Sequence, residues 1–325
     1  MQTTKEKIIQ YIKDKGSASA KDIIDSIGIS KQSIFIHLRD LLEDGSISKL
    51  GNPPKVFYIL NEEEKVSESI VFEERIKNII NENFFFTTPS GKVMKGVVGF
   101  IHWCERNNLD PIKTADDYSK TLEKYNKHKS KSGLINGMSK IESSFDKVYL
   151  DEVFYLDFYA IERFGKTKLG QLLLFGKNSQ DKKIIRDISN IIKDRVLSIV
   201  DEYEIDAVCF VPPTVKREVQ LMKELENNLK LPLKRVGVVK IKSDITVPQK
   251  TLNKIRDRIE NAEATFFVDN KGSYGNILII DDAVGSGSTL NVIAKKIREA
   301  KINNGKIIGL AITGSFKGFD VISEV

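Results

Sequence analysis

A strand, a polar turn and a helix follow one another directly near the end of the chain. Residues 277–280 are all apolar, and apolar side chains return at helical spacing at Val292, Ile293 and Ile297. A short apolar run that leads into a helical pattern is typical of a buried strand in a parallel sheet. The stretch therefore predicts a strand-loop-helix unit within a doubly wound α/β domain.

The turn of this unit concentrates acids, glycines and hydroxyl residues. Asp281 and Asp282 end the expected strand. The loop after them contains Gly285, Ser286, Gly287, Ser288 and Thr289. Such a loop presents backbone N–H groups, hydroxyls and a helix N-terminus to one point, which suits a phosphate dianion. The two carboxylates can accept hydrogen bonds from vicinal hydroxyls or hold a magnesium ion. No G-K-[ST] sequence occurs here, which excludes a Walker-type lysine loop.

The segment ILIIDDAVGSGST resembles the phosphoribosyl diphosphate motif of type I phosphoribosyltransferases. In that motif an apolar strand precedes two acids, a three-residue spacer, Thr or Ser, Gly, any residue and Thr. Ser286 stands here for the usual Thr. The resemblance implies that Asp281 and Asp282 serve catalysis by binding the ribose hydroxyls, and that they bind the magnesium that arrives with the substrate. It also implies that residues 285–289 wrap the 5-phosphate.

The chain upstream of this motif is similar to the ComF-like group of phosphoribosyltransferases. The segment VPQKTLNKIRDRIENAEATFFV matches that group at Gln249, Leu252, Arg258, Asn261 and Phe266. The similarity implies a catalytic role for Arg258. It also implies that three cations help to hold the substrate: Lys177, Lys216 and Arg217. The chain departs from the group in two ways, because the four-cysteine zinc finger is absent and the R-G-F-N-Q turn is reduced to residues 217–220.

Four further elements are expected in this half of the chain. Isoleucines between residues 184 and 199 recur at helical spacing and predict a long amphipathic helix. Apolar runs at 207–211, 236–241 and 307–313 predict three more strands. Together with the strand-loop-helix unit, they complete the expected doubly wound domain.

The first sixty residues predict a separate small domain. Apolar residues at helical spacing indicate three short helices, a tight turn at residues 28–30 precedes the third, and two short strands surround residues 51–54. This order resembles the winged helix-turn-helix domains of bacterial transcription regulators, which implies double-stranded DNA as a partner. The implied DNA-binding residues are Lys31, Gln32, Ser33, His37 and Arg39 on the third helix and Lys49 and Lys55 on the wing. Because acids nearly balance bases here, a dimerisation or protein-docking module is the alternative.

The expected organisation is a multidomain α/β protein. Residues 1–61 are the expected winged helix-turn-helix, residues 62–148 a helical connector domain and residues 149–325 the phosphoribosyltransferase-like domain. The connector carries no recognisable chemistry and is expected to be a helical segment that packs on its neighbours. A homodimer is expected, with the connector as a candidate for its interface.

Composition restricts the partners and the metals. The chain has 325 residues, 41% hydrophobic and 30% charged, with no run long enough to span a bilayer and no apolar signal region. A cytoplasmic protein without a membrane partner is therefore expected. Two cysteines and three scattered histidines do not suit a four-ligand zinc site, so magnesium is the metal expected, and no zinc. The net charge of +6 suits an anionic partner.

Three functions fit these patterns. The first is a phosphoribosyltransferase that transfers phosphoribosyl to a nitrogenous base and releases pyrophosphate. The second is a non-catalytic transcription regulator that senses phosphoribosyl diphosphate or a nucleotide through the same pocket. A remote alternative is a DNA-associated effector in competence or defence. The motif serves the first two equally well, whereas the shortened pyrophosphate turn and the winged helix favour binding without efficient turnover.

Overall fold

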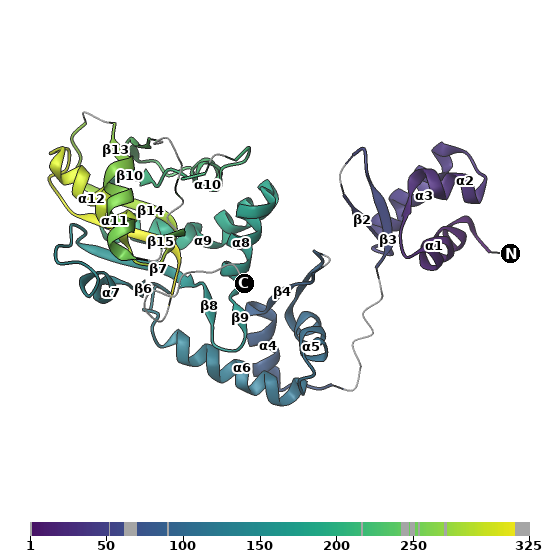
Figure 1. Cartoon of the computed structure of the whole chain (residues 1–325). Coiled ribbons are helices and arrows are strands. Elements are labelled where there is room, and N and C mark those ends of the chain that lie inside the picture. The colour runs from purple at the N-terminus through teal and green to yellow at the C-terminus, as the bar shows by residue number, and fades with distance from the viewer. Residues whose placement is uncertain are drawn as a thin grey trace. The chain divides into compact units, whose positions relative to one another are not determined.

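The computed structural model describes residues 2–51, 53–61, 70–89, 91–215, 217–241, 247, 251–252, 254–269 and 272–315. The chain divides into two compact units, Met1–Ser69 and Ile70–Val325 (Figure 1). Each unit has a hydrophobic core of its own.

Unit 1 has the order of elements expected from the sequence. It contains α1 (Thr4–Lys15), β1 (Ala18–Ser19), α2 (Ala20–Ile27), α3 (Lys31–Glu43), β2 (Ile47–Leu50) and β3 (Phe57–Leu60). The strands form an antiparallel sheet in the order β1-β3-β2. The side chains of Thr3, Ser19 and Ser30 cap the three helices by accepting backbone N–H groups of the first turn. Gly28 ends α2 in the left-handed conformation, at φ 71°, and so makes the turn into α3.

Unit 2 begins with a mostly helical segment that contains three short strands. Its elements are α4 (Glu74–Asn83), β4 (Phe85–Thr87), β5 (Val93–Lys95), α5 (Gly96–Arg106), α6 (Pro111–Asn126), β6 (Ile135–Asn136) and α7 (Met138–Glu142). The antiparallel hairpin β4–β5 was not expected, because residues 62–148 were predicted to be a helical connector. Phe84, Phe100, Trp103 and Tyr118 form an aromatic cluster with ring centroids 5.1–6.3 Å apart. Trp103 is therefore part of the packing of this segment.

A six-stranded sheet forms the body of unit 2, in the order β11-β10-β14-β15-β7-β6. Its strands are β7 (Glu152–Phe158), β10 (Ile205–Phe210), β11 (Lys234–Arg235), β14 (Asn276–Val284) and β15 (Ile307–Gly314), all parallel to their neighbours, with β6 antiparallel at the edge beside β7. The expected boundary at residue 148 thus falls between two strands of one sheet. The strand predicted at 236–241 is shorter in the structure. It is β12 (Val238–Lys240), which pairs with β13 (Phe266–Val268) outside this sheet.

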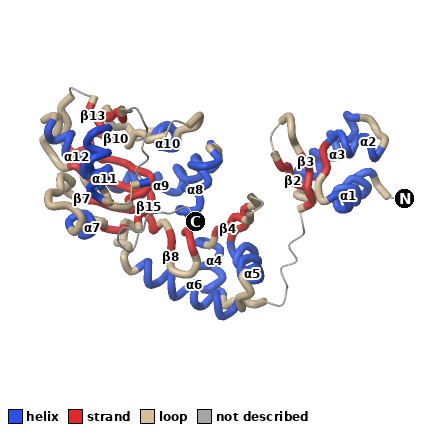
Figure 2. The backbone as a smooth tube through the Cα atoms, viewed as in Figure 1, coloured by secondary structure: helices blue, strands red, loops and turns tan. Residues whose placement is uncertain are grey.

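Helices cover both faces of the sheet (Figure 2). One face carries α8 (Lys168–Ser179), α9 (Lys182–Glu202) and α10 (Leu221–Leu229), whose apolar side chains share a core with Leu278, Ile280 and Leu310. The other face carries α12 (Ser288–Glu299), which packs against α11 (Ile255–Thr265). A side chain at Gly309 would meet Leu290 of α12 at 3.2 Å, which places α12 against β15. The result is a mixed α/β unit whose parallel strands end at one edge; β8 (Ala160–Ile161) and β9 (Gly165–Lys166) form a small separate hairpin.

Candidate functional site

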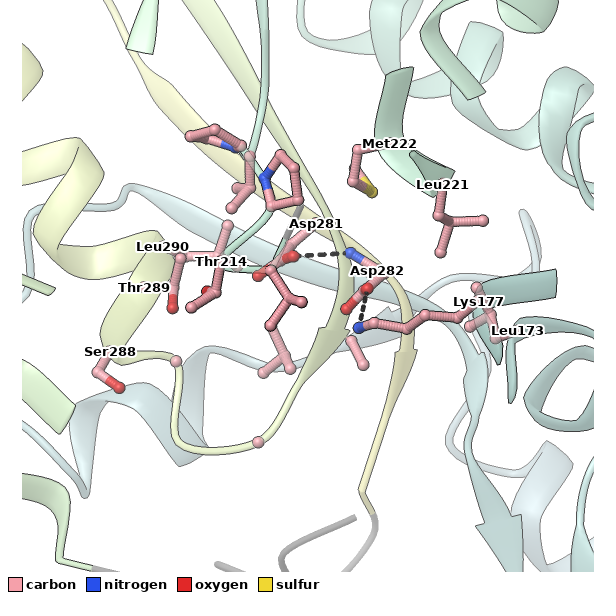
Figure 3. A pocket seen from close by; sticks show the side chains of 18 of the residues that line it. Leu173, Lys177, Thr214, Leu221, Met222, Asp281, Asp282, Ser288, Thr289 and Leu290 are labelled. Atoms are coloured by element: carbon pink, nitrogen blue, oxygen red, sulfur yellow. Dashed lines mark hydrogen bonds and ion pairs between the residues drawn. The ribbon is translucent and has the colours of Figure 1, made fainter. Parts of the chain in front are cut away.

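Strand β14 places the two acids at the carboxyl end of the parallel sheet, where open α/β sheets bind ligands. Asp281 lies opposite Ala311 of β15, and pairing continues to Val284, so the strand extends two residues beyond the acidic pair. The backbone N–H of Asp282 donates to Asp281 Oδ1 at 2.8 Å. Lys177 of α8 reaches the same point, and its Nζ donates to Asp282 Oδ2 at 2.5 Å (Figure 3).

The electrostatics of the acidic pair follow from burial and from two neighbouring charges. Burial raises the pKa of Asp281, and the adjacent Asp282 carboxylate raises it further, because two negative charges lie close together in a poorly hydrated place. The carboxylate of Asp282 in turn raises the pKa of Lys177 above its usual range. The site therefore holds a cation at the point where the acids converge.

The loop after β14 leads into helix α12 through a glycine that the conformation requires. Gly287 has φ 80° and is the N-cap residue of α12. A methyl group there would overlap Cδ1 of Ile141. Glycine has no side chain to cap the helix, and the N–H of Ser288 donates to Ser286 Oγ at 3.4 Å, so the N-terminus of α12 is only partly capped and can receive an anion. Ser286 and Ser288 are both buried, and their hydroxyl oxygens lie 2.7 Å apart in a hydrogen bond.

These elements enclose a cavity of about 300 Å³. It is lined by side chains of α8, the segment after β10, the start of α10, the acidic pair and the loop at residues 285–289. Figure 3 shows Lys177, Leu173 and Met222 on one side of the acidic pair and Ser288 and Thr289 on the other. The structure thus brings together charged groups and residues of the glycine-rich loop that are more than one hundred residues apart in the chain.

Arg258 of α11 also lines the cavity. It is 9% exposed, its Nε donates to the carbonyl of Leu252 at 2.7 Å, and burial lowers its pKa. Its Nη1 lies 3.6 Å from the position that a Cβ on Gly285 would take. A guanidinium therefore faces the loop.

The other expected cations are placed differently. Arg217 lines the cavity, but its guanidinium donates to the carbonyl of Lys177 and to Asn178 Oδ1, and so it ties the segment after β10 to the end of α8. Lys216 and Gln249 lie outside the described residues.

Sequence reasoning missed Lys240. Its Nζ donates to Thr214 Oγ1 at 3.0 Å and lies 4.5 Å from the centroid of the Phe266 ring, and both of these partners line the cavity. Burial lowers the pKa of Lys240 to about 8, partly offset by the negative charge of Asp281. The signal in the sequence was a lysine inside the apolar run 236–241.

In unit 1 the predicted DNA-binding residues separate into two groups. Lys31, Gln32, Arg39, Lys49 and Lys55 are exposed. Ser33 and His37 are half-buried, and Nδ1 of His37 is buried with no hydrogen-bond partner within the described chain. His37 is therefore only partly accessible on α3, and its Nδ1 faces away from solvent. Two large apolar residues that were not predicted, Phe35 and Ile36, are exposed instead.

Among the described residues, no group of three or more His, Cys, Asp or Glu is arranged to hold a metal ion. No helix in the described part of the chain is both long and apolar enough to cross a bilayer. Cys104 and Cys209 are free and buried, as expected for core thiols.

Comparison with known proteins identifies unit 1. Residues 1–47 match the family model described as winged helix-turn-helix DNA-binding. Unit 1 is a winged helix-turn-helix. No curated protein matches the chain. Among solved structures, a hypoxanthine phosphoribosyltransferase from Staphylococcus aureus is similar at 17% identity and a TM-score of 0.25, over 43% of this chain and 82% of that chain. That likeness is too slight to carry an argument about unit 2.

Proposed function

We propose that the cavity at the end of β14 binds phosphoribosyl diphosphate and that the protein transfers the phosphoribosyl group to a nitrogenous base. The observation that carries the proposal is the meeting of two adjacent carboxylates with a glycine-rich turn at an open helix N-terminus, in one cavity. The turn suits a sugar phosphate, and the carboxylates suit the neighbouring ribose hydroxyls. A reaction at the ribose C1 carbon would break its bond to diphosphate and form a bond to the base nitrogen.

The cations of the cavity support binding of the leaving diphosphate. Lys177, Arg258 and Lys240 come from three separate elements and all lie at the cavity or on its lining residues. A diphosphate that leaves with several negative charges needs such donors, because water is partly excluded from the site. The ion pair between Lys177 and Asp282 would open so that each partner could bind the substrate.

Magnesium fits the acidic pair. Asp281 and Asp282 offer hard carboxylate oxygens, and Mg²⁺ is commonly held by one or two carboxylates together with substrate phosphates. No third protein ligand of the usual kind accompanies them among the described residues, so the ion would enter with the diphosphate. Its chemistry there would be to neutralise charge on the leaving group.

A non-catalytic sensor is the second candidate. Arg217, the first residue of the shortened pyrophosphate turn, donates its guanidinium hydrogen bonds to the carbonyl of Lys177 and to Asn178 Oδ1 of α8. A pocket that holds the ribose phosphate but grips diphosphate weakly would bind its ligand without turnover. We propose in either case that unit 1 binds double-stranded DNA, and coupling would require different ligand affinities in the DNA-bound and free states.

Calorimetry with phosphoribosyl diphosphate and Mg²⁺, beside an assay of pyrophosphate release with a panel of nucleobases, tests the proposal. The site variant is Asp281→Asn/Asp282→Asn. The matched control is Asp187→Asn/Asp194→Asn, which removes the same charge from exposed positions of α9.

We expect the wild-type protein and the control to bind, and the site variant to lose binding. Release with one base identifies an enzyme and its acceptor. Binding of phosphoribosyl diphosphate without pyrophosphate release for any base supports the non-catalytic sensor. No binding by the wild-type protein would refute the assignment of the site.

A further inference from the structure

The exposed face of α3 carries an apolar centre between two cations. Lys31, Gln32, Phe35, Ile36 and Arg39 are all exposed, and their spacing places them along one side of the helix. Phe35 is 43% exposed and Ile36 51%. We call these five residues the α3 stripe.

The core of unit 1 does not explain the two apolar side chains. Ile34, Leu38 and Leu41 form the buried side of α3 and pack with residues of α1, α2 and the sheet. Phe35 and Ile36 lie outside that cluster of buried residues and those packed against it. Exposed apolar residues are common one at a time, but two adjacent ones on this helix call for a partner.

The charges around the stripe suit a polyanion. Residues 31–39 contain no acid. Of the acids that follow, Asp40 pairs with Lys5 at 3.1 Å, and the exposed Glu43 lies 3.9 Å from Arg39. The helix that would enter the groove therefore presents cations at the two ends of its apolar centre.

We propose that Phe35 and Ile36 contact thymine methyl groups in the major groove and that the site bound by unit 1 is consequently rich in A·T pairs. The proposal rests on DNA binding by unit 1 as stated above. Thymine is the base whose major-groove edge carries a methyl group, and apolar side chains are its usual partners. Gln32, one turn before Ile36, supplies the amide that pairs with both groups on the adenine edge. The first turns of a recognition helix are the part that reaches the bases.

A protein partner fits the stripe less well. The exposed area of Phe35 and Ile36 together is on the order of 200 Å², since a large aromatic side chain offers about 150–250 Å² in total. A stable protein interface buries about 800 Å² on each side. Two side chains bordered by cations fall well short of that area.

Replacement of thymine by uracil isolates the methyl group, because it leaves the hydrogen-bonding groups of the base unchanged. Duplexes are first enriched by the full-length protein from a pool with a randomised centre. The enriched duplex is then prepared with deoxyuridine at each thymine in turn. Affinity is measured by fluorescence anisotropy at several salt concentrations.

We expect one or two positions at which uracil weakens binding by about fourfold, the value for one methyl group removed from an apolar contact. Ile36→Ala and Phe35→Ala should each lose this discrimination at one position and keep the salt-dependent, sequence-independent binding that phosphate contacts supply. Ile112→Ala, at a 59% exposed isoleucine of α6, is the matched control and should discriminate like the wild type.

Two outcomes contradict the inference in different ways. Equal affinity of the wild-type protein for thymine and uracil duplexes overturns methyl recognition but leaves DNA binding in place. If the protein enriches and binds no duplex and Phe35→Ala changes its oligomeric state, the stripe is a protein interface. That outcome contradicts both methyl recognition and DNA binding. The first comparison uses the wild-type protein alone, so it does not depend on the folding of a variant.

Discussion

Gly287→Ala should destabilise unit 2 by about 2–5 kcal/mol. The residue has φ 80°, and a side chain in the left-handed region costs about 1–2 kcal/mol. The new methyl would also overlap Cδ1 of Ile141, a fully buried residue of α7. Forcing an extra methyl into a packed core costs about 1–3 kcal/mol, and the two costs add because they act on different groups.

Urea denaturation followed by tryptophan fluorescence measures this cost for unit 2 alone. Trp103 is the sole tryptophan of the sequence and lies in the aromatic cluster of unit 2. Gly285→Ala is the matched control, because its nearest contact is Arg258 Nη1 at 3.6 Å and its φ is outside the left-handed region. The control should change the free energy of unfolding by less than about 0.5 kcal/mol.

A double mutant separates the clash from the backbone strain. In an Ile141→Ala background the overlap disappears, so Gly287→Ala should cost only the strain of about 1–2 kcal/mol. The difference between the two backgrounds, about 1–3 kcal/mol, is the contribution of the clash. Equal costs for Gly287→Ala and Gly285→Ala in the wild-type background would refute the loop geometry on which the proposed phosphate site depends.

Three further predictions follow from burial. Burial raises the pKa of both Cys104 and Cys209 to about 12, so neither thiol should react with a disulfide reagent near neutral pH until urea unfolds the protein, and rapid labelling of the native chain would contradict their burial. Leu38→Ala should destabilise unit 1 by about 2–5 kcal/mol and weaken DNA binding, while the urea midpoint reported by Trp103 stays unchanged. Burial lowers the pKa of Lys240 from 10.5 to about 8, so between these values the unfolded chain binds the extra proton, and wild-type stability should rise with pH relative to Lys240→Met. If the difference in unfolding free energy between those two proteins does not change with pH, burial does not lower the pKa of Lys240.

Local patterns accounted for the elements that bear the proposed sites. The apolar run before Asp281 predicted β14, and the spacing of isoleucines predicted the helices of unit 1 and α9. Periodicity and turn glycines are visible in the sequence because they depend on neighbours a few residues away. The loop that contains Gly285 and Gly287 was found in the same way, from its glycines and hydroxyl residues.

The membership of the cavity lies beyond such patterns. Lys177 was expected from a resemblance, Lys240 was not predicted, and Arg217 proved to be engaged on α8. Whether a cation points into a site depends on the packing of α8 and β12 against the ends of β10 and β14, which are distant in the chain. The hairpin β4–β5 escaped prediction for a similar reason, because its short strands are held by the helix and aromatic side chains packed beside them.

Periodicity therefore specified which segments carry the acids, the glycines and the recognition helix, because those signals are short-range. Long-range packing decided which side chains meet and which stay exposed: Lys177 lies against Asp282, and Nδ1 of His37 is buried while Phe35 and Ile36 face solvent. The physical reason is that a side chain's environment is the sum of contacts from several elements. One stretch of sequence specifies only the contacts that its own residues make.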